Sequence, residues 1–124
     1  MTEQTPEFWT MTGTFDDQPI TLDAHAARYA HNDRLAILLY TTDDAPELFA
    51  DLSINVPHVQ LADDQRQIIV DHNITSETLA MAIASGLLHD TPDDTVHVGM
   101  TTSHVYSLTP QAAQWATTTA PTAR

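Results

Sequence analysis

Short stretches of alternating polar and apolar residues fill most of this chain, and pairs of aspartates interrupt them. Alternation with a period of two is typical of strands that bury one face. Aspartate favours turns because its side chain hydrogen-bonds the backbone two residues further on. The pattern therefore predicts a mainly antiparallel sheet whose turns carry four doublets: Asp16-Asp17, Asp43-Asp44, Asp63-Asp64 and Asp93-Asp94.

The alternating stretches predict four strand units, at residues 8–23, 34–56, 66–72 and 96–108. All but the third are expected to be β-hairpins. Residues 34–40 are apolar on both faces, as in a central strand that is covered on each side. Residues 24–33 contain helix-forming alanines over only ten positions, so a helical turn and a wrapped loop both remain open.

One amphipathic helix is predicted at about 76–88, because its leucine, isoleucine and alanine residues recur on a single face. Thr75 or Ser76 is expected to cap its start. A second, short helix is expected from Thr109-Pro110 to about Trp115. The predicted fold is α+β: one mainly antiparallel sheet of about 5–7 strands, with the 76–88 helix packed on one face. Residues 1–116 are expected to form one domain and residues 117–124 a disordered tail.

The charge balance limits the partners of this chain. Seventeen acidic residues face four arginines and no lysine, for a net charge of −13. Direct binding to nucleic acid or to an anionic membrane is then disfavoured, because both need a cationic surface. General solubility is the competing explanation of the charge. With no apolar run of membrane-spanning length, no signal-peptide core and no cysteine, we expect a cytoplasmic protein of a bacterial cell or a phage-infected host.

Motifs for catalysis or cofactor binding are sparse. The seven histidines follow no dense metal-ligand spacing. His97 and His104 would face each other if the last hairpin were centred between Met100 and Thr101, and Asp71 or His72 would then complete a metal site; surface histidines are the favoured alternative. Glycine-rich phosphate loops, EF-hand loops and nucleophile motifs are missing from the sequence. We therefore expect no cofactor, no metal and no enzymatic activity.

The densest run of acids lies in the second hairpin, where Asp43, Asp44, Glu47 and Asp51 fall within nine residues. Same-face neighbours on a strand lie about 6.6 Å apart, and we estimate a similar spacing, roughly 6–7 Å, for successive phosphates of DNA. Phe49 would provide an apolar anchor between Glu47 and Asp51. The other interpretation is a solvated outer strand. The predicted partner-binding residues are Asp43, Asp44, Glu47, Phe49, Asp51, Asp16, Asp17, Asp63 and Asp64.

Residues 20–74 resemble a family of small uncharacterised proteins from bacteria, phages and other mobile elements. The resemblance is carried by Leu22-Asp23 to Tyr29, Asn32 with Arg34-Leu35-Ala36-Ile37, Ser53-Ile54-Asn55-Val56-Pro57, and Val70-Asp71-His72-Asn73. It departs at Ala45-Pro46-Glu47-Leu48-Phe49, where the family has a glycine-containing turn. The resemblance implies a bacterial or phage origin and a mobile-element setting, and no activity, cofactor or catalytic residue comes with it.

Together these features predict an acidic inhibitor that competes with nucleic acid for a basic protein groove. Anti-CRISPR and antirestriction proteins that mimic DNA are the expected classes. The expected partner is a protein with a basic nucleic-acid-binding surface. The alternative is a non-catalytic protein-interaction module, such as an immunity or antitoxin-like partner or a regulatory adaptor of a mobile element, with an apolar hot spot around Phe49.

Overall fold

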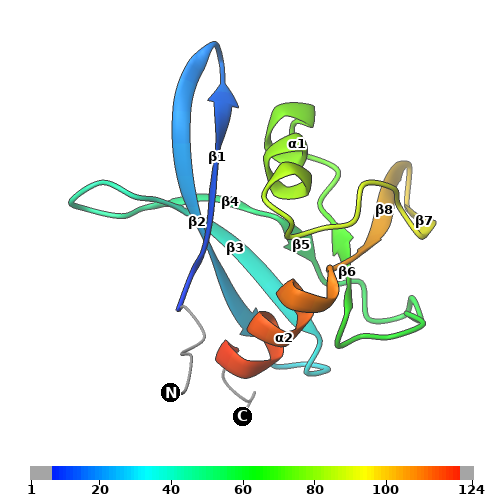
Figure 1. Ribbon diagram of the computed structural model, residues 1–124. Helices are drawn as coiled ribbons and strands as arrows, with labels where there is room; N and C mark the ends of the chain where they lie inside the picture. Colours follow the sequence, from blue (N-terminus) through cyan, green and yellow to red (C-terminus); the bar gives the residue numbers. More distant parts are fainter. Residues whose placement is uncertain (1–6, 121–124) are drawn as a thin grey trace.

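A computed structural model describes residues 7–120 and shows two four-stranded antiparallel sheets and two helices (Figure 1). Sheet A has the order β1 (Trp9–Phe15), β2 (Gln18–Arg28), β3 (Leu35–Thr41), β4 (Leu48–Asp51). Sheet B has the order β5 (Ser53–Ile54), β6 (Gln67–Val70), β8 (Thr101–Ser107), β7 (Asp94–Val98). The helices are α1 (Ser76–Ala84) and α2 (Pro110–Thr119). The α+β class is confirmed, whereas two sheets of four strands replace the single sheet of 5–7 strands.

The division into two sheets occurs at Leu52, inside the stretch 34–56 that was predicted as one hairpin. β4 ends at Asp51 in sheet A, and β5 begins at Ser53 in sheet B. Leu52 is fully buried, and its N–H donates to the Ile37 carbonyl at 2.9 Å. The Ser53 hydroxyl accepts the Ile37 N–H at 3.0 Å. Beyond the end of β4, a side-chain oxygen therefore satisfies this backbone donor in place of a strand carbonyl.

β2 is longer than the sequence predicted, because residues 24–28 continue the strand and form neither a helical turn nor a loop. Ala24 lies opposite Trp9 on one side and Leu39 on the other. Residues 25–28 pair with β3 alone, because the ladder with β1 ends at the Trp9–Ala24 pair. This pairing with β3 outweighs the helix propensity of alanine. The turn between β1 and β2 consists of Asp16 and Asp17.

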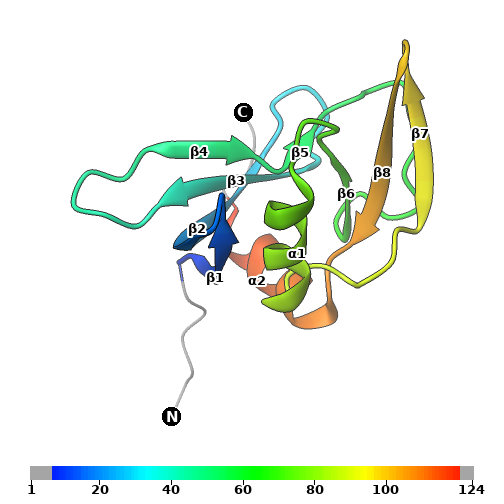
Figure 2. The same ribbon diagram turned by 90° about the horizontal axis from the view of Figure 1, so that it is seen from above.

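Both helices pack on the same face of sheet A (Figures 1 and 2). α1 contacts β1 at Gly13, where an added Cβ would lie 2.4 Å from Met81 Cγ. α2 contacts β2, and the ring of Trp115 lies 5.6 Å from that of Trp9. The main core therefore lies between sheet A, the helices and the side of sheet B that carries Ile68, Val70 and Tyr106. No helix of residues 7–120 covers the opposite face of sheet A.

α1 begins as predicted and ends early. Thr75 caps its start by accepting the Thr78 N–H at 3.2 Å. Ser85 forms the C-cap, and Gly86 follows with φ of +82°, a left-handed conformation that glycine adopts at no steric cost. Leu87 is fully buried although it lies beyond the end of the helix. The apolar pattern of residues 76–88 therefore predicted buried positions correctly and the end of the helix too late.

α2 begins as predicted, with Thr109 as N-cap and Pro110 in the first turn. It continues to Thr119, four residues beyond the predicted end, and Ala120 after it is buried. Residues 117–119 of the predicted tail therefore belong to this helix, and residues 121–124 lie outside the described part. No helix in residues 7–120 has the length and apolar character that a bilayer crossing requires.

Candidate functional site

Three of the four aspartate doublets build turns, as the sequence predicted, whereas Asp94 of the fourth doublet begins β7. Asp16 and Asp17 have φ of 53° and 62° and form the two-residue loop between β1 and β2. Positive φ at both central residues is the geometry of a mirror-image hairpin turn, which aspartate tolerates better than most residues. Asp43 accepts the Ala45 N–H and Asp63 accepts the Gln65 N–H, each at 3.0 Å, so both close an Asx turn. These turns hold their carboxylates on ordered backbone.

Two of the acidic turns lie at the same end of sheet A, because β1 and β3 run in the same direction. The ends of the two hairpins are joined where Phe15 and Phe49 meet edge to face, with ring centroids 5.1 Å apart. Beyond this contact the hairpin tips diverge (Figure 1). We call the pair the hairpin fork. Its exposed carboxylates belong to Asp16, Asp17, Asp43, Asp44 and Glu47.

Phe49 was predicted as an exposed anchor between Glu47 and Asp51, but its ring turns toward the core. A β-bulge between Leu39 and Tyr40 disturbs the register of β4, so the simple alternation of residues 47–51 is broken. The Phe49 ring is partly buried and packs against the main core. Leu48 is the exposed apolar residue of this strand, with 51% of its surface accessible, and it lies opposite Tyr40.

Asp63 and Asp64 lie away from the hairpin fork, so the predicted partner-binding residues do not form one surface. Their loop, between β5 and β6, lies across the molecule from the tip of the β3–β4 hairpin (Figures 1 and 2). Gln67 accepts the Asp63 N–H at 3.1 Å and donates to Asp93 at 2.8 Å. Two doublets distant in sequence are thus neighbours in a second acidic region.

Glu77, in the first turn of α1, is a further acidic residue that lies beside the hairpin fork and that the sequence did not indicate. Its Oε2 accepts the Asp16 N–H at 3.2 Å across 61 residues of sequence. No local pattern signals this contact, because it depends on how α1 packs on β1.

The arginines of the described residues do little to neutralise the acids. Arg28 donates to the Asp33 carbonyl and to Gln65, and lies 3.9 Å from the Asp33 carboxylate. Arg34 donates to the Val56 and Val59 carbonyls. Arg66 is exposed, and among residues 7–120 none of the three donates to a carboxylate of the hairpin fork. The fork therefore presents negative charge alone.

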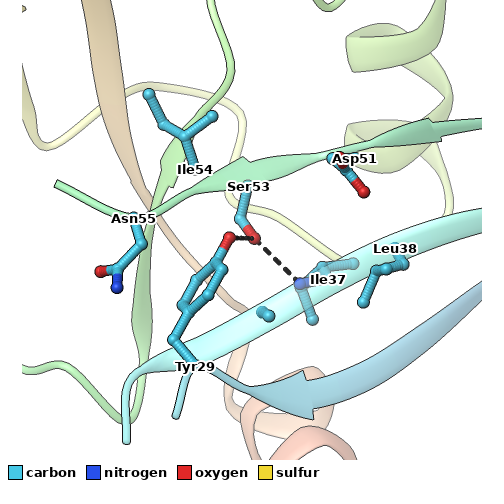
Figure 3. Close-up of a pocket in the computed structure, with 8 residues that line it drawn as sticks. Tyr29, Ile37, Leu38, Asp51, Ser53, Ile54 and Asn55 are labelled. Atoms are coloured by element: carbon cyan, nitrogen blue, oxygen red, sulfur yellow. Dashed lines mark hydrogen bonds between the residues drawn. The ribbon is translucent and has the colours of Figure 1, made fainter. Parts of the chain in front are cut away.

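A cleft of about 360 Å³ opens beside the free edge of β3, where β4 has ended (Figure 3). Volumes of roughly 300–1,000 Å³ accommodate small ligands. Asp51 and Leu38 lie on one side of the cleft in Figure 3, and Tyr29 and Asn55 lie on the other. We call it the Tyr29 cleft. It is lined by Tyr29, Ala36, Ile37, Leu38, Asp51, Ser53, Ile54 and Asn55.

Tyr29 is fixed in this cleft by a short chain of hydrogen bonds. Its hydroxyl and that of Ser53 share a hydrogen bond of 2.8 Å, and Ser53 also accepts the Ile37 N–H (Figure 3). Burial raises the pKa of Tyr29 above 10.0, the Ser53 hydrogen bond opposes the rise, and the nearby carboxylates of Asp51 and Asp71 add to it. The phenol therefore stays neutral at physiological pH, in a negative surrounding.

His97 and His104 do not face each other, as the predicted metal site would require. The last hairpin turns at Gly99-Met100, one residue earlier than the prediction needed. His97 therefore lies opposite Thr102 and His104 opposite Thr95. No cluster of three or more possible ligands for a metal ion occurs within residues 7–120.

Comparison with known proteins does not assign this chain to a family. No protein-family model matches the chain, and neither the curated proteins nor the solved structures that were searched contain a significant match.

Proposed function

We propose that this protein is a non-catalytic inhibitor that occupies the basic groove of a nucleic-acid-binding protein in place of the nucleic acid. The hairpin fork is the binding surface. The observation that carries this proposal is the exposure of five fork carboxylates on ordered hairpin turns, to which no arginine of residues 7–120 donates. A cationic groove gains from such a surface through favourable long-range attraction.

Order in the turns supports this role. A carboxylate on a fixed turn loses less conformational freedom on binding than one on a disordered loop, so more of the electrostatic attraction remains as affinity. The φ angles at Asp16 and Asp17 and the Asx turn at Asp43 provide that order. The proposed partners are nucleic-acid-binding enzymes of the CRISPR or restriction classes, since their grooves are built to receive phosphates.

The proposal is tested with a variant that removes charge from the tips and keeps the turns. The tip variant carries Asp16→Asn, Asp17→Asn, Asp43→Asn and Asp44→Asn, because asparagine tolerates positive φ and keeps the Oδ1 acceptor. The control removes the same charge from the far side: Asp63→Asn, Asp64→Asn, Asp90→Asn and Asp94→Asn. Both are titrated into DNA-binding assays of a CRISPR effector–guide complex and of a restriction enzyme.

We expect the unmodified protein to inhibit DNA binding by one of these enzymes, with potency falling roughly tenfold or more between about 50 and 200 mM salt. The tip variant should lose most of this inhibition, while the control retains most of it. Inhibition that ignores ionic strength, equal losses in both variants, or no inhibition of either enzyme class would contradict the proposal.

The alternative of an apolar interaction module is favoured by one observation, the exposure of Leu48. Leu48 lies beside Tyr40 on the face of sheet A that bears no helix, and the rings of His25 and Tyr40 lie 4.4 Å apart on that face. Under this alternative, Leu48→Ser weakens partner binding and the tip variant does not. The two variants in the same binding assay separate the two functions.

A further inference from the structure

The Tyr29 cleft combines apolar walls with a carboxylate and holds no basic side chain among its lining residues. Ala36, Leu38 and Ile54 contribute the apolar surface. Asp51 is exposed and contributes the charge. The amide oxygen of Asn55 already accepts a hydrogen bond from Asn32 at 3.0 Å, so Asp51 is the acceptor with capacity to spare.

The charges around the cleft are negative on two sides. Asp51 is the last residue of β4 in sheet A and Asp71 follows β6 in sheet B, and both carboxylates raise the pKa of Tyr29. Arg28 and Arg34 donate instead to other acceptors in residues 7–120. A guest that carries a positive charge and an apolar stem complements these surroundings.

We propose that the Tyr29 cleft receives an arginine side chain, with its guanidinium on the Asp51 carboxylate and its stem along Leu38 and Ile54. This inference rests on the proposed function, because it specifies which groups of the cationic partner are bound. Arginine fits better than lysine, since a planar guanidinium pairs with a carboxylate through two donors and stacks on an aromatic ring such as that of Tyr29.

The position of the cleft agrees with this role. Asp51 ends β4, which is the returning strand of the hairpin whose turn carries Asp43 and Asp44. It lies opposite Leu38, on the face of sheet A that bears no helix. A partner that grips the fork along this hairpin therefore reaches the cleft with the same surface.

The test measures binding of N-acetyl-arginine amide to the complete protein by two-dimensional NMR. We expect saturable shifts at millimolar ligand, confined to the amides of β3 near Ile37 and of residues 51–55. Citrulline amide has nearly the same shape without the charge and should not bind. Asp51→Asn should weaken binding roughly tenfold or more, as expected for a charge-assisted hydrogen bond. Asp90→Asn removes one exposed carboxylate outside both the cleft and the fork, so it is the matched control and should leave binding unchanged.

Three results would overturn the inference: no saturable shift with the arginine compound, equal binding of citrulline amide, or unchanged binding by Asp51→Asn. Tighter binding of N-acetyl-lysine amide would also overturn the assignment to a guanidinium. The tip variant retains Asp51, so it should bind the arginine compound normally. If the cleft does not bind the arginine compound, the proposal that the fork inhibits DNA binding is unaffected. If the fork does not inhibit, arginine binding in the cleft can still be measured.

Discussion

Single acidic residues in this protein differ in what their oxygens contact. Asp16 and Asp17 set the backbone of a turn and leave their carboxylates in solvent. Asp93 instead ties strands together, because its Oδ2 accepts hydrogen bonds from Gln67 of β6 and from Ser107 of β8. These two bonds lower the pKa of Asp93, with Ser107 the larger cause and His89 a smaller one. The same residue type therefore serves local geometry at one position and tertiary contact at another.

A pH dependence follows from Asp93. Because its folded pKa lies below the unfolded value, the stability it contributes is present above about pH 4 and is lost as the pH falls through the folded pKa. We expect Asp93→Asn to lower the unfolding free energy at pH 7 by at most about 1 kcal/mol, since the carboxylate is exposed and screened. Urea unfolding at several pH values should show this difference shrinking below about pH 4. Asp90→Asn is the control, because this carboxylate has no hydrogen bond or ion pair within residues 7–120. A difference that grows in acid would contradict the assignment to Asp93.

At the scale of elements, the contact between α1 and β1 organises one end of the core. Gly13 lets the helix approach the strand, and Met81 fills the space where its Cβ would be. Met81 is buried, with 3% of its surface accessible. The close approach also brings Glu77 to the Asp16 N–H, so the packing of this helix shapes the hairpin fork.

Gly13→Ala tests this packing. We expect it to destabilise the protein by about 1–3 kcal/mol, because the new methyl group overlaps Met81. In a Met81→Ala background the same change should cost much less, since the space is then open, and a double-mutant cycle measures the coupling. Thr12→Ala, at an exposed neighbouring position, should stay within about 0.5 kcal/mol of the unmodified protein. A neutral Gly13→Ala would show that the helix does not need this close approach.

At the scale of the whole molecule, the carboxylates are crowded onto one small fold. The closest cation–carboxylate contacts that we identify within residues 7–120 are Arg28 with Asp33 at 3.9 Å and His72 with Asp71 at 3.6 Å. With a net charge of −13, repulsion among the acids opposes the compact state. The surface that favours a cationic partner therefore has a cost in stability.

Salt should reveal that cost. We expect the Tm to rise when NaCl increases from about 10 mM to about 500 mM, because a shorter screening length weakens repulsion among surface charges. The tip variant and its control each remove four charges and should both show a shallower rise. Differential scanning calorimetry measures the effect. A Tm that falls with added salt would mean that attractive ion pairs outweigh the repulsion.

Local patterns in the sequence were sufficient for the turns, the helix starts and the α+β class. The turns at Asp43 and Asp63 form because each side chain bonds a backbone N–H two residues on, and the turn at Asp16 and Asp17 forms because aspartate tolerates positive φ. The caps at Thr75 and Thr109 are local in the same way. Tertiary contacts decided the rest. The chain leaves sheet A at Leu52, where the Ser53 hydroxyl accepts the Ile37 N–H, and β2 stays extended through residue 28 because it pairs with β3 as far as Arg28 and Leu35.

The candidate surfaces divide in the same way. Which residues are acidic and sit in turns is written in the sequence, and so is the chain's large negative charge. That two acidic hairpins meet through Phe15 and Phe49, and that the 63–64 doublet lies on another side, depends on how the strands pair and curve. The Tyr29 cleft likewise forms from segments more than twenty residues apart. Sequence determines what interacts over one or two residues, whereas distances between remote segments are set only when the core packs.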